Sequence, residues 1–166
     1  VGYFKAVGAE ADCLPNPYFT KPIASEQVAT VIDNKDPMNQ GRVKVHFAWQ
    51  TGITNSEWIR VMTPDAGGSK AVSKNRGYVA IPEIGDQVMV GFTNGHPDRP
   101  YVMGSMFHGK VALGGGINNK IKSIQTRSGI RILMNDEDGS ITIIDPSGNI
   151  YLMDGKGNIN LTAPND

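Results

Sequence analysis

A glycine-phased repeat over residues 129–162 constrains the fold of this chain more than any other feature. Its glycines are spaced 10, 9 and 9 residues apart, and a short run of alternating aliphatic residues follows each of them: Gly129, Gly139, Gly148 and Gly157. Alternation with a period of two is the pattern of a β-strand with one apolar face. Each unit therefore predicts one short strand and one turn. Residues 120–126 look like a degenerate unit ahead of the first glycine.

The aliphatic residues of the repeat define one predicted apolar stripe. In the last three units an isoleucine follows the glycine by two positions and a second aliphatic residue by four, and the first unit is shifted by one position. The stripe comprises Ile130, Ile132, Ile141, Ile143, Ile150, Leu152, Ile159 and Leu161. We predict that these residues make the contacts between chains, and that Ile150→Asp abolishes trimer formation.

A repeat unit this short cannot bury its stripe alone. Stacking on neighbouring units of one chain is one solution, and winding of identical chains around each other is the second. The few aliphatic residues compensate poorly for the backbone entropy lost when about 40 residues are ordered. The pattern therefore favours an oligomeric β-prism, most simply a threefold one.

The region before the repeat contains five predicted strands and no helix. The strands cover residues 27–32, 42–49, 57–62, 87–93 and 101–104, with a further short extended run at 78–81. In residues 42–49 the pattern predicts an inward face, which is Val43, Val45, Phe47 and Trp49, and a polar outward face, which is Arg42, Lys44 and His46. One polar face is typical of an antiparallel sheet or barrel. Five strands with unequal loops favour an OB-type barrel over a sandwich, so we expect an all-β chain.

Composition and charge exclude several classes of function. The chain has 16 Lys+Arg and 16 Asp+Glu, which disfavours binding to a phosphate backbone because that needs clustered basic residues. No apolar run is long enough to span a bilayer. The single cysteine, Cys13, excludes a disulfide framework and a cysteine-built metal site. The first residues lack Met and signal-peptide features, so we expect no signal peptide and a segment of a longer protein.

No motif for catalysis, a cofactor or a metal emerges from the residues. The three histidines are unpaired in sequence and are interpreted as solvated or turn residues: His46, His96 and His108. Residues 67–70 (GGSK) lack the spacing of a phosphate loop, and the acidic run 136–138 lacks that of a calcium loop. We therefore expect no enzyme, no cofactor and no metal. Four aromatic residues are interpreted as core or interface residues: Trp49, Trp58, Tyr78 and Phe92.

Several sequence motifs, which we also call phrases, occur in the same order as in the OB domain of the VgrG spike-protein family and resemble it. Residues 29–49 fit the phrase A-x-V-x-D-N-x-D-P-x-x-x-G-R-V-[KR]-V-x-F-x-W, and residues 56–61 fit S-x-W-x-R-V. Residues 82–92 fit P-x-I-G-D-x-V-x-V-x-F, and residues 95–105 fit G-x-P-D-R-P-x-[VI]-x-G-S. The resemblance covers roughly residues 26–108, and the glycine-phased strands lie where such spikes place a needle-like trimeric β-helix.

The resemblance implies a homotrimeric, cell-puncturing spike of a contractile injection apparatus, like those of type VI secretion and phage tails. It implies an irregular lead-in over residues 1–25, an OB barrel over 26–108, a linker with the first needle strand over 109–122, and needle repeats over 123–166. The implied partners are a tube protein (Hcp-like) at the base and a PAAR-like tip or an effector at the needle end, with transient contact with the target membrane and no nucleic acid. The implied localisation is assembly in the bacterial cytoplasm followed by secretion through the apparatus.

Two alternative functions remain at this point. An OB-fold module could bind an oligosaccharide or single-stranded nucleic acid, and the near-zero net charge weakens the second ligand. A phage-type baseplate spike could be associated with cell-wall hydrolysis, but no lysozyme-like domain is recognisable in the sequence. Neither alternative explains the repeat.

Overall fold

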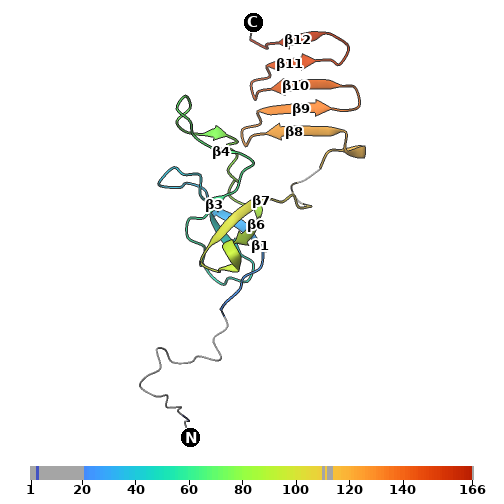
Figure 1. Ribbon diagram of the computed structural model, residues 1–166. Helices are drawn as coiled ribbons and strands as arrows, with labels where there is room; N and C mark the ends of the chain where they lie inside the picture. The colour runs from blue at the N-terminus through green and yellow to red at the C-terminus, as the bar shows by residue number, and fades with distance from the viewer. Residues whose placement is uncertain (1–2, 4–20, 110, 112–113, 166) are drawn as a thin grey trace.

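The computed structural model describes residues 3, 21–109, 111 and 114–165, which form a barrel and a separate C-terminal sheet (Figure 1). The strands of the first part are β1 (Gln27–Asp33), β2 (Lys44–Phe47), β3 (Arg60–Val61), β4 (Ala66–Gly67), β5 (Arg76–Gly77), β6 (Gln87–Phe92) and β7 (Pro100–Ser105). The C-terminal sheet contains β8 (Ile121–Gln125), β9 (Arg131–Asn135), β10 (Ser140–Ile144), β11 (Ile150–Met153) and β12 (Ile159–Thr162). Two 3-10 turns, η1 (Thr93–Gly95) and η2 (Ile117–Asn119), are the helical elements of the described residues.

The first five-stranded sheet is curled and has the order β2-β1-β6-β7-β3. Its neighbours are antiparallel except for β3 and β7, which are parallel. The two outer strands are joined by an isolated antiparallel bridge between Val43 and Ile59, with backbone N–O distances of 3.0 and 2.9 Å. This bridge connects the sheet edges and leaves fewer unpaired backbone groups.

The core of the described residues lies entirely inside this barrel. Alternate residues of each strand point inward, as the period-two pattern requires. The buried hydrophobic side chains are small or β-branched apart from one phenylalanine: Ala29, Val31, Val43, Val45, Phe47, Ile59, Val88, Val90 and Val102. The predicted all-β fold with a five-stranded barrel sheet is therefore confirmed.

Two details of the predicted strands are wrong. Trp49 is 67% exposed, because β2 ends at Phe47 and a turn follows, in which the backbone N–H of Gln50 donates to the Phe47 carbonyl at 3.0 Å. The Trp49 ring instead stacks on the Phe47 ring at a centroid distance of 5.5 Å. Residues 78–81 are not a strand either. The backbone N–H of Tyr78 donates to the backbone carbonyl of Asp65, and the strand in this region is β5, which ends one residue earlier.

The loop between β1 and β2 is organised by the carboxylate of Asp36. Asp36 accepts hydrogen bonds from the backbone N–H groups of Met38, Gln40 and Arg42, at 3.0, 2.9 and 3.3 Å. The Arg42 guanidinium donates to both carboxylate oxygens, at 2.7 and 3.0 Å. The Arg42 side chain is the main cause that holds the pKa of Asp36 well below its usual range. The acidic and basic residues of the D-P-x-x-x-G-R phrase are thus a structural pair.

A hairpin of β4 and β5 projects from the barrel beside the C-terminal sheet (Figure 1). Arg76 and Asp65 form an ion pair at its base, at 2.8 Å. Gly77 has φ +109°, and a Cβ there would lie 2.1 Å from the Asp65 carbonyl oxygen. Only glycine permits this close approach of the two strands.

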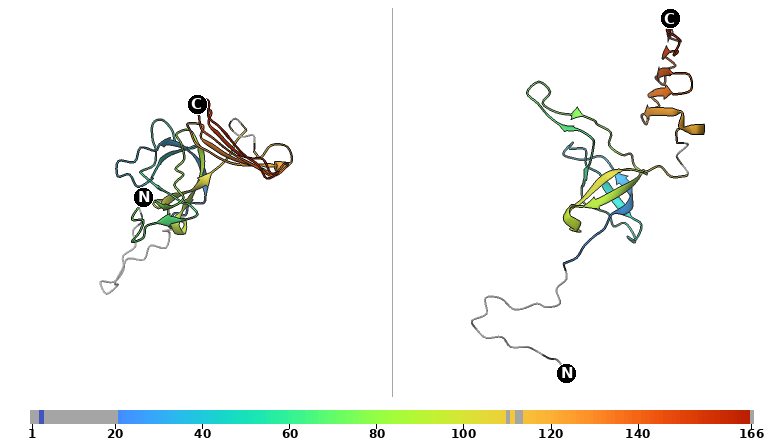
Figure 2. Two further views of the ribbon diagram at one scale, coloured as in Figure 1. Left: turned by 90° about the horizontal axis from the view of Figure 1, so that it is seen from above. Right: turned by 45° about the vertical axis from the view of Figure 1, so that its right-hand side comes forward.

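The repeat forms a second five-stranded sheet (β8–β12), which we call the needle sheet after the needle that the resemblance implies. Its strands pair with their neighbours in sequence, and every pair is antiparallel. Seen from above, the needle sheet is one thin layer (Figure 2). Each repeat unit therefore forms one strand, as predicted, and hydrogen-bonds to the next unit of the same chain. Strand β8 crosses the domain boundary expected after residue 122.

Two turns of the needle sheet have the same construction. In each, an aspartate carboxylate accepts hydrogen bonds from the backbone N–H groups two and four residues later and from the side-chain amide of an asparagine. The pairs are Asp145 with Asn149 and Asp154 with Asn158. Between them lies a glycine with positive φ, +95° at Gly148 and +96° at Gly157. The need for this backbone conformation explains two of the repeated glycines.

The needle sheet meets the barrel through the turn between β8 and β9. Arg127 in this turn donates to a carboxylate oxygen of Glu83 at 3.0 Å, and the Asn34 side chain donates to the same oxygen at 3.1 Å. The Arg127 side chain is 78% exposed. We therefore assign this contact a small share of stability, about 1 kcal/mol at most.

Candidate assembly surface

The pairing register gives the needle sheet two chemically different faces. Residues paired across antiparallel strands lie on the same face. We call one side the apolar face; it consists of two ladders, Ile124–Ile132–Ile143–Tyr151–Leu161 and Lys122–Met134–Ile141–Met153–Ile159. We call the other side the polar face; it contains Ile121, Ser123, Gln125, Arg131, Leu133, Asn135, Ser140, Thr142, Ile144, Ile150, Leu152, Asn160 and Thr162. Lys122 is thus the one polar residue of the ten on the apolar face.

The pairing register of the strands distributes the residues of the predicted apolar stripe over both faces of the sheet. Five of its residues, Ile132, Ile141, Ile143, Ile159 and Leu161, lie on the apolar face. Ile130 precedes β9 and lines one groove with Ile143 and Leu161 of that face. The remaining two, Ile150 and Leu152, pair with Thr162 and Asn160 on the polar face. The assumption of one stripe is therefore wrong, and the role of these residues in chain association stays a prediction.

Four residues of the apolar face are absent from the stripe that was predicted by counting from each glycine: Ile124, Met134, Tyr151 and Met153. Equivalent positions in successive units are nine residues apart, so an odd-numbered position in one unit corresponds to an even-numbered position in the next. Across the turn after β10, however, odd-numbered residues pair with odd-numbered ones, such as Ile143 with Tyr151. Equivalent positions of successive nine-residue units consequently fall on opposite faces. Matching residues at equal distances on the two sides of each turn, instead of counting forward from each glycine, would have found the correct set.

The needle sheet contains no buried residue in any of its five strands. Its exposed large hydrophobic residues all belong to the apolar face or precede it at Ile130; those within the strands are Ile124, Ile132, Met134, Ile143, Ile159 and Leu161. The apolar residues of the polar face are less exposed than these. Exposed apolar surface of this extent marks a site of association.

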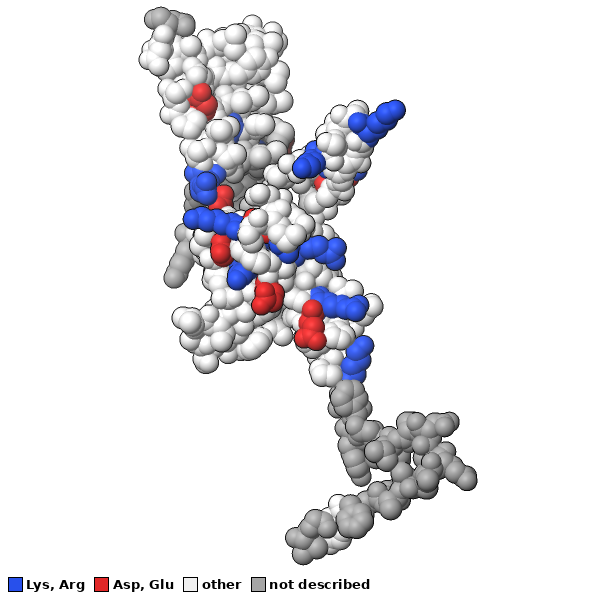
Figure 3. All heavy atoms as spheres, turned by 90° about the vertical axis from the view of Figure 1, so that its left-hand side faces the viewer, with Lys and Arg blue, Asp and Glu red and all other residues white. Residues whose placement is uncertain are grey.

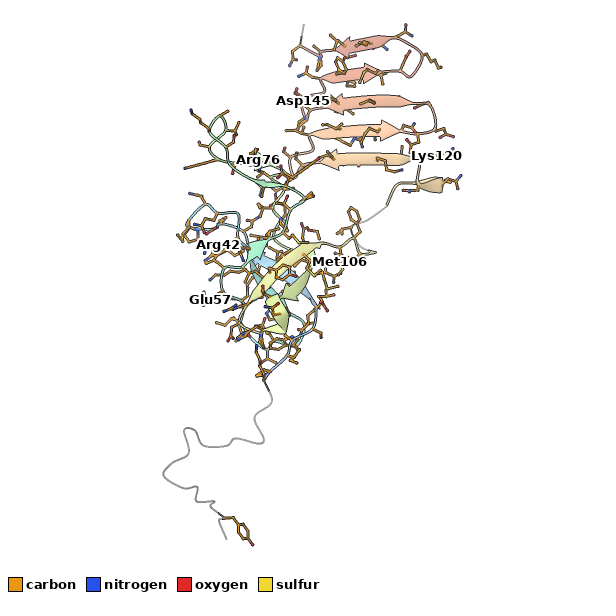
Figure 4. All side chains as sticks on the ribbon, viewed as in Figure 1. Arg42, Glu57, Arg76, Met106, Lys120 and Asp145 are labelled. Carbon is orange, nitrogen blue, oxygen red and sulfur yellow. The ribbon has the colours of Figure 1, made fainter. Side chains whose placement is uncertain are left out.

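Charged side chains lie at the margins of the needle sheet. Asp145 lies at one lateral edge and Lys120 at the opposite edge (Figure 4). The one charged residue of the apolar face, Lys122, lies on the first strand and bonds to Asp136 at 3.2 Å. On the side of the molecule in Figure 3, basic and acidic residues are interspersed over the barrel, and the upper needle sheet carries few of them.

The barrel carries a second surface feature, an aromatic groove of about 650 Å³. Phe47 stacks between Trp49 and Phe92, and Trp58 also lines the groove. The Trp49 indole N–H donates to the Gln27 side chain at 2.6 Å. Of the four aromatic residues predicted for core or interface, Trp49 and Tyr78 are mostly exposed, whereas Phe92 packs against the core.

The remaining sequence candidates are dispersed over the described part of the chain. His46 bonds to the Thr54 carbonyl at 2.8 Å, and His96 accepts from the Asp98 backbone at 3.3 Å. Residues 67–70 run from the end of β4 into the loop of the exposed β4–β5 hairpin, and Asp136 and Glu137 pair with Lys122 and Lys120, respectively. Among the described residues, no three His, Cys, Asp or Glu side chains gather as a metal site would require, and no helix has the length and apolarity to cross a bilayer. Cys13 lies outside the described residues.

Comparison with known proteins places the barrel in a described family. Residues 27–107 match the family described as the type VI secretion system/phage-baseplate injector OB domain. The match covers the curled sheet from the first residue of β1 to just beyond β7. Its bounds are close to those expected from the sequence phrases, residues 26–108.

Individual relatives extend this similarity. The type VI secretion system spike protein VgrG1b of Pseudomonas aeruginosa is 36% identical over 139 residues, which cover 74% of this chain and 17% of the relative. The spike protein VgrG1a of the same species is 43% identical over 95 residues, or 55% of this chain and 13% of the relative. The actin cross-linking toxin VgrG1 of Vibrio cholerae is 33% identical over 102 residues, or 59% of this chain and 9% of the relative.

The chain spans less than a fifth of the length of these relatives, and the similarity concerns that part alone. Two of them are named as spike proteins and the third as a toxin. The ordered sequence motifs, the curled five-stranded sheet and the family match all indicate the same OB domain. The chain belongs to the VgrG family of type VI secretion spike proteins, and its residues 27–107 are the injector OB domain.

Proposed function

We propose that this chain is the structural collar and needle of a trimeric, cell-puncturing spike in a contractile injection apparatus. In this proposal the OB barrel of residues 26–108 is the collar, residues 109–122 contain the linker and the start of the first needle strand, and residues 123–166 form the rest of the needle. The function is mechanical, with no catalytic residue and no cofactor.

The needle sheet is the observation that carries the proposal. It is a single layer with nine apolar residues among the ten of one face, and none of its strands contains a buried residue. A lone sheet of this kind lacks the hydrophobic burial that stabilises folded domains. Three such sheets, each forming one side of a prism, cover one another's apolar faces. Membership of the spike family supports this arrangement.

The proposal includes partners and a localisation. The spike assembles in the bacterial cytoplasm and is then secreted by the apparatus towards a target envelope, with transient contact with the membrane. An Hcp-like tube protein binds at the base, and a PAAR-like tip protein or an effector binds at the needle end. The balanced charge of 16 basic and 16 acidic residues argues against nucleic acid as a partner.

The solution mass of the chain tests the proposal directly. Size-exclusion chromatography with light scattering is expected to give about 54 kDa, three times the chain mass of 17.9 kDa. A mass of one chain across the accessible concentration range would contradict the three-chain needle. Ligand binding at the aromatic groove of the barrel would then be the function to test next.

A further inference from the structure

We propose that the β4–β5 hairpin is an arm that binds the needle sheet of an adjacent copy of this chain, with two of its lysines against the turn between β9 and β10 of that copy. We call residues 64–80 the arm. This inference rests on the proposed function, which supplies the adjacent copies, and goes beyond it. The proposed function joins the chains through their needle sheets, whereas the arm links the barrel of one chain to the needle of the next.

The arm has little support within its own chain. Every residue from 64 to 80 is exposed, and each of its two strands is two residues long. Val72, Tyr78 and Val79 are 48%, 65% and 64% exposed. A two-stranded hairpin without further packing is marginally stable in water. The arm is therefore expected to gain burial from a partner.

The position of the arm indicates where this partner lies. The arm projects to the level of the first needle strands and stands apart from its own needle sheet (Figures 1 and 2). Among the described residues, no hydrogen bond or ion pair joins residues 66–77 to the needle sheet, because their bonds stay within the hairpin and its base. The surface of the arm is thus available beside the needle.

Rotational symmetry brings the opposite edge of an adjacent needle sheet towards the arm. When identical chains surround one axis, each contact joins two different surfaces, so one lateral edge of a sheet lies next to the opposite edge of the next sheet. Arg76 of the arm lies on the side of Asp145, and Lys120 lies at the opposite edge (Figure 4). The turn between β9 and β10 belongs to the Lys120 edge, because the backbone N–H of Asp136 donates to the Lys120 carbonyl at 2.9 Å.

The arm carries basic charge that its own chain does not neutralise. Residues 66–77 contain three basic residues and no acidic one, and basic side chains lie at the end of the arm (Figure 3). Arg76 pairs with Asp65 at 2.8 Å. Lys70 and Lys74 have no carboxylate within ion-pair distance in the part of the chain that the structure describes. Two amines are therefore free for an acidic partner.

The turn between β9 and β10 offers the matching carboxylates. Asp136 and Glu137 each pair with a lysine of their own chain, yet their side chains are 66% and 63% exposed. Asp138 follows them and forms no ion pair with any described residue; its carboxylate accepts the backbone N–H of Ser140 at 3.0 Å. Three carboxylates thus face two lysines. Exposed ion pairs contribute little stability each, but opposite charges fix the register of two surfaces.

Zero-length cross-linking of the unmodified protein tests the contact. A carbodiimide joins a lysine amine to a carboxylate as an amide, with loss of one water, where the two groups touch. Assemblies are prepared from equal amounts of chains with light and heavy nitrogen, so a link between chains can join one light and one heavy peptide. We expect such mixed links from Lys70 or Lys74 to residues 136–138. The link between Lys120 and Glu137, which pair within one chain, is the internal control.

The outcomes separate this inference from the proposed function. Native mass spectrometry first verifies that the assemblies contain both isotopes. If the control link forms and links from the arm to the turn are missing, or join only peptides of one isotope, the contact is overturned while a mass of three chains still supports the spike. If the unmodified chain is a monomer, the proposed function and the arm contact both fall.

A matched pair of double substitutions measures what the contact does. Lys70→Glu with Lys74→Glu reverses both free charges of the arm. Lys21→Glu with Lys35→Glu makes the same change of net charge at exposed positions outside the arm. We expect the arm variant to exchange subunits about tenfold faster than the unmodified assembly, and the control variant to exchange at the unmodified rate. Adding Glu137→Lys to the arm variant is expected to slow the exchange again, because opposite charges are restored.

Tryptophan fluorescence, which reports on the barrel, verifies that each of these variants is folded. Equal exchange rates for the arm variant and the control variant would overturn the contact. Faster exchange of the arm variant that Glu137→Lys does not reverse would overturn the assignment of the turn as its partner.

Discussion

Gly155 lies where two turns of the needle sheet come into contact. It has φ +71°, and a Cβ at this position would lie 2.2 Å from the Asp138 carbonyl oxygen of the turn between β9 and β10. Gly157, two residues later, has φ +96° with open space around it. The two glycines share an unusual backbone conformation and differ in steric surroundings, so they form a matched pair.

We predict that Gly155→Ala destabilises the needle sheet more than Gly157→Ala does. The positive φ alone costs an alanine about 1–2 kcal/mol. At Gly155 the clash with backbone atoms adds to this, for a total of about 3 kcal/mol or more. Thermal unfolding of the needle sheet by circular dichroism measures the difference. Equal shifts for the two variants would show that the turns do not touch as described.

The turns are also the elements through which pH acts on the needle sheet. Hydrogen bonds from Ser147 and Asn149 lower the pKa of Asp145 from 3.8 to about 2. Asp154 is shifted in the same direction, chiefly by Asn158. A lowered pKa in the folded state means that folding favours the ionised carboxylate.

We predict that the needle sheet loses stability as the pH falls from about 4 to about 2. The contribution of Asp145 is complete above its ordinary pKa of 3.8 and is lost as protonation proceeds through about 2. Unfolding followed by circular dichroism at several pH values measures this loss. Asp145→Asn is the control, because it cannot titrate, and its stability is expected to fall less steeply over the same range. An unchanged slope in Asp145→Asn would contradict the role of this turn.

At the scale of the whole molecule, the barrel and the needle sheet depend on different sources of stability. The barrel buries nine hydrophobic residues of its own, whereas the needle strands bury none within one chain. Among the described residues, one ion pair joins the barrel to the needle sheet, and it is the exposed pair of Arg127 and Glu83. The barrel is therefore expected to fold without help from the needle sheet, and the needle sheet to depend on association.

We predict two unfolding transitions with different dependence on protein concentration. Both tryptophans, Trp49 and Trp58, belong to the barrel, so their fluorescence reports on the barrel alone. This transition is expected to be independent of concentration. The needle transition, followed by circular dichroism, is expected to shift upward as concentration rises, because association stabilises by mass action. A single transition that is independent of concentration by both probes would contradict this division.

The sequence by itself determined the features that depend on neighbouring residues. Period-two alternation located the barrel strands and the repeat strands, because burial of one face requires that period. The phrase that contains Asp36 and Arg42 identified the family, and these two residues interact within one short loop. Interactions of this kind join residues a few positions apart, so they can be recognised from the sequence without knowledge of the fold.

The tertiary structure alone decided which side chains share a face. Ile150 and Tyr151 are adjacent in sequence, and only the pairing of β11 with β10 and β12 places Tyr151 in the apolar ladder and Ile150 opposite. Likewise, Trp49 continues the alternation of β2 but lies on the surface, because the chain turns after Phe47. Register and strand ends are set by hydrogen bonds between distant segments, and a shift of one residue exchanges the two faces of a strand.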